Sequence, residues 1–133
     1  MIELYVISVA TKKLCGTGFI ARSDKEEHRH MLKLHPGITL NQAEIEGAAF
    51  ALESVKPMFR GEEVKLYTRS TYAIGFTTRK ANGDYSSYPS KNVELIERFR
   101  ETIETFENLR MVKIERTHDI VETIKTLIAK DSK

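Results

Sequence analysis

The stretch that decides the fold is Gly37-Ile38-Thr39-Leu40-Asn41-Gln42-Ala43-Glu44-Ile45-Glu46-Gly47-Ala48-Ala49-Phe50-Ala51-Leu52-Glu53. From Asn41 onward, its apolar side chains recur at helical spacing. They are Ile45, Ala48, Ala49, Leu52 and Val55. Pro57 stops the run. Because much of this face is alanine or glycine, we predict a helix that packs very close to a sheet.

Three strands are expected before this helix. Residues 2–10 are rich in Val, Ile and Tyr and almost uncharged, which is typical of a central strand buried on both faces. A turn at 11–13 leads into a second strand over 14–22, and the two form a hairpin. Residues 27–34 alternate as an edge strand does, and 35–37 end it.

After the helix, the sequence predicts two strands that alternate with helices. In chain order the expected elements are a strand over 63–68, a short helix capped by Ser70, a loop over 80–89, a long helix capped by Ser90, a strand over 111–115 and a last helix opened by Thr117 or Asp119. This order implies an α/β fold with a mixed five-stranded sheet. A three-strand antiparallel meander joins two parallel strands, with helices on both faces.

The composition places these elements in one domain. The chain has 133 residues, with 21 Lys and Arg, 19 Asp and Glu, and one Cys. We expect one domain over residues 1–130 and a disordered tail at 131–133. A formal charge of +2 does not by itself announce a nucleic-acid-binding protein.

The single cysteine and the N-terminus bear on location. Cys15 cannot form an intrachain disulfide and is interpreted as a small residue that is buried or half-buried. The uncharged run before Lys12 is too short for export or for spanning a membrane. We therefore expect a cytoplasmic protein without a membrane partner.

Three local motifs resemble those of the type 1 ribonuclease H family, which includes the RNase H domain of reverse transcriptases. Residues 37–45 resemble the T-x-N-x-A/M-E-L opening of the family's central helix. Residues 66–72 are similar to a strand end that reads x-T-D-S-x-Y, and residues 89–95 resemble a K-N-x-D/E-L run. Since the motifs occur in the family's order, the resemblance implies a ribonuclease H-like fold over nearly the whole chain.

The catalytic positions depart from the family pattern. The resembled enzymes hold two divalent cations between four acidic residues. On this resemblance Glu44 is the surviving catalytic carboxylate, whereas Ile7, Arg69 and Lys125 replace the others. A guanidinium ~4 Å from a divalent ion repels it by roughly 8 kcal/mol at an effective dielectric constant of 20. We therefore expect no metal cofactor, and predict that Arg69 pairs with Glu44 in place of the metals.

The resemblance also implies contacts to a nucleic-acid backbone. The expected binding residues are Asn41, Arg69, Lys80, Lys91 and His118. Other readings stay open for four residues, of which His118 either caps or contacts phosphate. Asn41 is a good helix N-cap and Glu44 suits the start of a helix, while Arg69 fits a solvated strand end.

The leading hypothesis is a catalytically inactive ribonuclease H-like protein that binds nucleic acid, either an RNA/DNA hybrid or a duplex. One alternative is an active, metal-dependent ribonuclease H that cleaves RNA in RNA/DNA hybrids. In that case Glu44, Asp119 and Glu122 hold Mg²⁺ or Mn²⁺. The second alternative is a protein-interaction module, a homodimer formed through strand 27–34 or the long helix.

Overall fold

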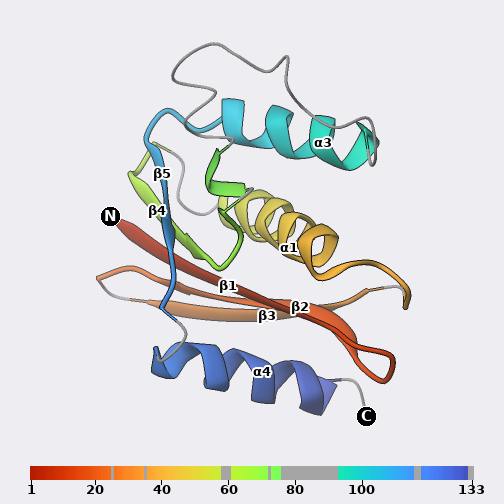
Figure 1. Cartoon of the computed structure of the whole chain (residues 1–133). Coiled ribbons are helices and arrows are strands. Elements are labelled where there is room, and N and C mark those ends of the chain that lie inside the picture. The colour runs from red at the N-terminus through yellow and green to blue at the C-terminus, as the bar shows by residue number, and fades with distance from the viewer. Residues whose placement is uncertain are drawn as a thin grey trace.

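Figure 1 shows the computed structural model of the chain, in which helices lie on both faces of one sheet. The structure describes residues 1–24, 26–34, 36–57, 61–71, 73–75, 93–115 and 118–131. The expected loop at 80–89 lies outside these residues, as do Ser90 and Thr117. The loop and the predicted caps at Ser90 and Thr117 therefore remain predictions.

Five strands form one sheet in the order β3-β2-β1-β4-β5. They are β1 (Ile2–Ala10), β2 (Cys15–Arg22), β3 (Glu27–Lys33), β4 (Val64–Thr68) and β5 (Leu109–Lys113). β1 and β3 each pair antiparallel with β2, and β1, β4 and β5 run parallel. The predicted meander and two parallel strands are confirmed. β5 begins two residues earlier than expected because Leu109 and Arg110 continue the pairing with β4.

The helices form a layer on each side of the sheet (Figure 1). α1 (Leu40–Val55) and α3 (Val93–Glu104) lie on one side, and α4 (Asp119–Asp131) lies on the other. α4 includes Asp131, the first residue of the tail expected to be disordered, while 132–133 lie outside the described residues. Within the described ranges, no helix is both long and apolar enough to cross a bilayer.

The sheet separates two apolar clusters, and β1 contributes to both. Leu4 and Val6 belong to the cluster formed with α1 and α3. Tyr5 and Ile7 belong to the cluster formed with α4. Successive side chains of a strand point to opposite faces, so a central strand needs apolar residues at every position. The expected burial of the first strand on both faces is confirmed.

A capping box starts α1. The Gln42 N–H donates to Thr39 Oγ1 at 3.1 Å, and the Thr39 N–H donates to Gln42 Oε1 at 2.7 Å. Thr39 is therefore the N-cap, and the interpretation of Asn41 as the cap is wrong. Because the helix begins at Leu40, Asn41 sits in its first turn with an exposed side chain.

The short helix after β4 and the last helix, α4, each begin at a side-chain cap. Ser70 Oγ accepts a hydrogen bond from the Ala73 N–H at 3.1 Å, so the predicted cap of the short helix is confirmed. α4 starts at Asp119, one of the two predicted opening residues. Its first turn is capped by His118, whose Nδ1 accepts from the Ile120 N–H at 3.2 Å.

Gly47 allows α1 to pack as closely on the sheet as its small residues predict. A Cβ at this position would lie 2.1 Å from Thr17 Oγ1 and 3.0 Å from Ser8 Oγ. The Ser8 hydroxyl is also within hydrogen-bonding distance of the Ala43 carbonyl oxygen, at 2.9 Å. The helix thus contacts polar side chains of β1 and β2 with no space for a methyl group.

Arg98 ties α3 to α1. Its Nε and Nη2 each lie 2.9 Å from a carboxylate oxygen of Glu53, and its Nη1 lies 2.6 Å from Glu46 Oε1. The hydrogen bonds from Arg98 lower the pKa of the Glu53 carboxyl. These contacts fix the outer helix on the one that carries Glu44.

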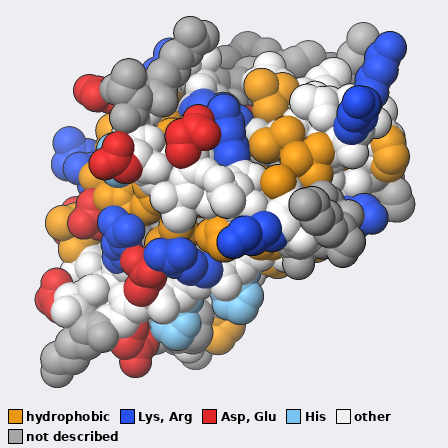
Figure 2. All heavy atoms as spheres, turned by 90° about the horizontal axis from the view of Figure 1, so that it is seen from below, with side chains coloured by type: hydrophobic (Ala, Val, Ile, Leu, Met, Phe, Trp, Pro, Cys, Tyr) orange, Lys and Arg blue, Asp and Glu red, His pale blue; other side chains and the backbone are white. Residues whose placement is uncertain are grey.

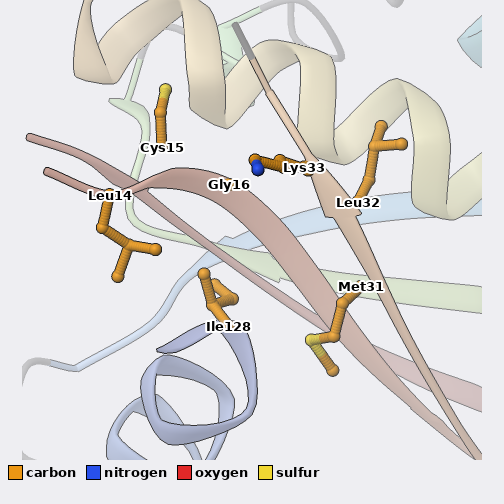
Figure 3. Close-up of a pocket in the computed structure, with 7 residues that line it drawn as sticks. All are labelled: Leu14, Cys15, Gly16, Met31, Leu32, Lys33 and Ile128. Atoms are coloured by element: carbon orange, nitrogen blue, oxygen red, sulfur yellow. The ribbon is translucent and has the colours of Figure 1, made fainter. Parts of the chain in front are cut away.

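A small apolar pocket lies where α4 meets the β1–β2 hairpin (Figure 3). Ile128 rises from α4 toward Leu14 and Gly16, while Cys15 points to the other side of the sheet. The volume of about 10 Å³ suits about one water molecule, so we interpret the pocket as a packing gap. Burial raises the pKa of the Cys15 thiol, and its half-buried position agrees with the sequence-based interpretation.

The contact at Gly47 can be tested by adding one methyl group. Gly47→Ala should lower the free energy of unfolding by about 1–3 kcal/mol, because Thr17 or α1 must move. Gly75→Ala is the matched control, since no described atom lies within 4 Å of its added Cβ. Urea unfolding of both variants measures the difference. Equal stability of the Gly47 variant and the unmodified chain would contradict the close packing.

Candidate functional site

Polar and charged groups gather at the carboxyl ends of the three parallel strands. Ser8 lies near the end of β1, Arg69 directly follows β4, and Lys113 is the last residue of β5. Thr68 pairs with Lys113 across the β4–β5 ladder. Since carboxyl ends of adjacent parallel strands meet at one edge, the topology brings these residues together.

The predicted pair of Arg69 and Glu44 is present. Arg69 Nη2 lies 2.8 Å from Glu44 Oε1, and Arg69 Nε lies 3.1 Å from the same oxygen. Glu44 comes from α1 and Arg69 from the end of β4, so the ion pair joins a helix to the sheet. The prediction that these two side chains pair is confirmed.

The backbone of β1 completes this arrangement. Arg69 Nη2 also donates to the Ser8 carbonyl oxygen. The Ser8 N–H in turn approaches Glu44 Oε1 at 3.4 Å. One serine residue therefore contacts the cation through its carbonyl and the anion through its amide, which fixes both side chains relative to the central strand.

The pair is largely removed from solvent. The side chain of Glu44 is 3% exposed and that of Arg69 is 24% exposed. Burial raises the pKa of Glu44, whereas the charge and hydrogen bonds of Arg69 and the Ser8 amide oppose the rise. Glu44 Oε2 is buried without a hydrogen-bond partner in the described structure. The carboxylate thus depends on Arg69 for most of its compensation.

Two clefts open beside this pair. The first, here called the glutamate cleft, has a volume of about 440 Å³. It is lined by Thr39, Leu40, Asn41, Glu44, Arg69 and Ser70. The second, here called the lysine cleft, has a volume of about 490 Å³. It is lined by Leu40, Arg69, Lys113, Ile114, Val121 and Lys125.

The two clefts share Leu40 and Arg69, so they adjoin. The structure therefore brings Asn41, Glu44 and Arg69 together, as the sequence predicted, and places Lys125 on the other side of Arg69. Figure 2 views the face that carries α4, where basic and acidic side chains are interspersed. Among the described residues, the lining of the lysine cleft itself contains three basic residues, Arg69, Lys113 and Lys125, and no acidic one.

The residues of these clefts do not fit the divalent metals that the family resemblance implies. Glu44 is the one carboxylate in the lining of either cleft, and a guanidinium occupies one of its oxygens. Among the described residues, no three His, Cys, Asp or Glu side chains gather as a metal site requires. A hard cation needs several anionic oxygens at close range, whereas the described charged residues that line the two clefts are one acid, Glu44, and three bases, Arg69, Lys113 and Lys125.

Several predicted residues lie away from the clefts. We expected Ile7 to line a pocket together with Glu44 and Arg69. Its side chain is instead buried in the α4 cluster, on the opposite face of the sheet from α1. The ring centroids of His118 and Tyr5 lie 5.4 Å apart. His118 also caps α4 through its Nδ1. Lys80 and Lys91 lie outside the described residues.

Asp119 and Glu122 were the added metal ligands of the active-enzyme alternative. Both are exposed in the first turn of α4, and neither is among the residues that line the two clefts. Glu122 Oε1 lies 4.0 Å from Lys125 Nζ. In the structure Glu122 therefore lies beside Lys125, and Glu44 is paired with Arg69.

Two residues of the site were missed in the sequence. Ser8 carries the backbone contacts of the ion pair, and Lys113 lines the lysine cleft. A polar residue within an otherwise apolar central strand could have marked Ser8. For Lys113 there was no such signal in the sequence, because the strand expected over 111–115 places it in mid-strand, whereas β5 ends at Lys113.

Comparison with solved structures identifies the fold. LC11-RNase H1 in complex with an RNA/DNA hybrid matches with a TM-score of 0.69 and 20% identity, over 100% of both chains. RNase H1 from the halophilic archaeon Halobacterium salinarum NRC-1 matches with a TM-score of 0.65 and 17% identity, over 97% of this chain and 95% of that one. The native protease-reverse transcriptase of prototype foamy virus matches with a TM-score of 0.63 and 16% identity, over 98% of this chain and 20% of that one.

These matches concern structure and not sequence. No protein-family model matches the sequence, and no curated protein matches it. The solved structures confirm the expected α/β fold with a mixed five-stranded sheet, which is ribonuclease H-like. At these identities the similarity establishes the fold alone.

The dependence of Glu44 on Arg69 predicts a pH-dependent loss of stability. In Arg69→Met the pKa of Glu44 should rise further, because only the Ser8 amide then opposes burial. When folding raises the pKa of an acid, the free energy of unfolding is unaffected below the unfolded pKa of about 4.3. The free energy of unfolding then falls as pH rises through the folded pKa. The variant should lose on the order of 3 kcal/mol at pH 8 and much less at pH 4.5, measured by urea unfolding.

The double variant Arg69→Met with Glu44→Gln is the control for this prediction. It removes both charges, so it should regain stability at pH 8 and show little difference between the two pH values. A loss in the single variant that is the same at both pH values would show that Arg69 acts through packing and not through the charge of Glu44.

Proposed function

We propose that this chain, which has the ribonuclease H-like fold, binds the backbone of a nucleic acid and does not cleave it. The observation that supports the proposal is the ion pair of Arg69 with Glu44, the one carboxylate that matches the family's catalytic set. A guanidinium bound to this carboxylate keeps a permanent positive charge at the site. Because this pair is neutral overall, attraction for a phosphate comes from the adjacent Lys113 and Lys125, whereas a divalent metal would find the one described carboxylate of the clefts already occupied.

Phosphate binding is supported by the residues next to the pair. Arg69, Lys113 and Lys125 bring three cations to the lysine cleft, and Asn41 adds an amide at the mouth of the glutamate cleft. Contacts of Arg, Lys and Asn to phosphate and sugar position a nucleic acid without reading its sequence. The expected ligand is an RNA/DNA hybrid or a duplex, and one neighbour of similar fold is in complex with an RNA/DNA hybrid.

Loss of hydrolysis follows from the same residues. Two-metal cleavage requires carboxylates that hold one ion for the attacking water and one for the leaving oxygen. On the resemblance, Ile7 and Arg69 stand at the first and third family positions, and the side chain of Ile7 is buried on the other face of the sheet. Within the described part of the chain no group of acidic residues replaces them.

The homodimer alternative remains a prediction. β3 is an edge strand of the sheet, as expected, and so presents an unpaired edge. However, it carries charged side chains at Glu27, Arg29 and Lys33, a composition that protects edges from pairing. The described structure therefore favours the nucleic-acid proposal over strand addition at this edge.

Binding to a labelled RNA/DNA hybrid tests the proposal. The affinity should fall as salt rises, because each neutralised phosphate releases counterions. Lys113→Ala with Lys125→Ala should weaken binding and make the slope of log K against log salt shallower by about 2. Lys33→Ala with Lys65→Ala is the charge-matched control, since neither residue lines the two clefts, and it should change the slope little. Affinity that does not depend on salt, or no affinity, would exclude the proposal.

A cleavage assay tests the absence of hydrolysis. Incubation of the hybrid with the protein in millimolar Mg²⁺ or Mn²⁺ should leave the RNA strand intact under conditions in which an active ribonuclease H cleaves it. Metal-dependent cleavage that is lost in Glu44→Gln would support the active-enzyme alternative instead.

A further inference from the structure

The lysine cleft differs from a flat basic patch because four segments enclose it. Leu40 comes from the start of α1, Arg69 follows β4, Lys113 and Ile114 lie at the end of β5, and α4 supplies Val121 and Lys125. Its volume of about 490 Å³ lies in the range of about 300–1,000 Å³ that is typical of small-molecule sites. The cleft can therefore take one compact group and not only the side of a long duplex.

Positive charge in this cleft is only partly balanced. Arg69 is paired with Glu44. Lys125 has Glu122 at 4.0 Å, but these side chains are 41% and 80% exposed, and an exposed pair of this kind contributes little. No ion pair of Lys113 is formed with the described residues. The cleft thus has more cationic charge than a single phosphodiester would neutralise.

The same cleft has an apolar part. Ile114 and Val121 are almost completely buried, while Leu40 is 48% exposed and lies in the lining of both clefts. Aliphatic side chains beside cations suit a ligand that carries a phosphate on a sugar or a base. A nucleotide at the end of a strand has this combination and can enter a cleft, since nothing continues beyond it.

We propose that the lysine cleft binds the terminal phosphomonoester of a nucleic-acid strand in preference to an internal phosphodiester. The proposal rests on the proposed nucleic-acid binding and adds the group that is recognised. A terminal phosphate carries about −1.5 to −2 charges at pH 7, whereas an internal phosphodiester carries about −1. Lys113 and Lys125, the two cations of the cleft that have no buried ionic partner among the described residues, match the greater charge.

Competition between short oligonucleotides tests this inference. Four versions of one strand are compared at constant salt: hydroxyl ends, a 5′-phosphate, a 3′-phosphate, and a 5′-phosphate methyl ester that keeps the size but has one charge. At least one phosphorylated strand should bind about tenfold more tightly than the hydroxyl strand, which corresponds to ~1.4 kcal/mol. The methyl ester should bind like the hydroxyl strand. A nucleoside 5′-monophosphate alone shows whether the strand contributes beyond its terminal nucleotide.

Variants separate the cleft from general charge. Lys113→Gln with Lys125→Gln should abolish the preference for phosphorylated ends, and Lys33→Gln with Lys65→Gln should preserve it. Equal affinity for all four strands would overturn the inference and leave the proposed backbone binding intact. No affinity for any strand or for the hybrid would overturn both. A preference that survives in the cleft variant would place the terminal phosphate elsewhere.

Discussion

The site depends on one buried ion pair, that of Arg69 with Glu44, and on the backbone of Ser8 that both side chains contact. A carboxylate taken out of water needs a compensating charge or must be protonated. Here Arg69, which directly follows β4, supplies that charge. The pair therefore has two consequences, because it compensates Glu44 and also leaves this carboxylate with no need of a metal as its partner.

The surrounding fold makes this exchange possible. β1 lies at the centre of the sheet between β2 and β4. It runs antiparallel to β2 and parallel to β4, so the carboxyl ends of β1 and β4 lie side by side. α1 is held close to the sheet by Gly47, which places Glu44 within reach of a side chain from the end of β4. The same parallel arrangement puts Lys113 beside this site. The topology thus places basic side chains, Arg69 and Lys113, at the carboxyl ends of two neighbouring parallel strands.

Much of the fold was predictable from the sequence. Three features predicted the element order and the position of Glu44: the almost uncharged sequence of β1, the alanine-rich face of α1 and the three motifs. The resemblance predicted that Glu44 pairs with Arg69. The misses have local physical reasons. Asn41 is a good cap by type, but the reciprocal bonds of Thr39 and Gln42 start the helix earlier. Ile7 aligns with a catalytic position, yet strand alternation directs its side chain to the α4 side, and the backbone of the next residue, Ser8, makes the contacts to the pair. Lys113 could be placed at the site only from the register between β4 and β5, which a single sequence does not give.

The central claim is that Arg69 takes the place of metal ions as the partner of Glu44. Paramagnetic broadening by Mn²⁺ tests it most directly, because the ion broadens the amide signals of residues close to where it binds. Titration into the millimolar range should leave the signals of Ser8, Glu44 and Arg69 no more broadened than those of other surface residues, and Arg69→Asp, which restores a carboxylate, should make the broadening local and saturable. Saturable broadening centred on Ser8 and Glu44 in the unmodified chain would contradict the account.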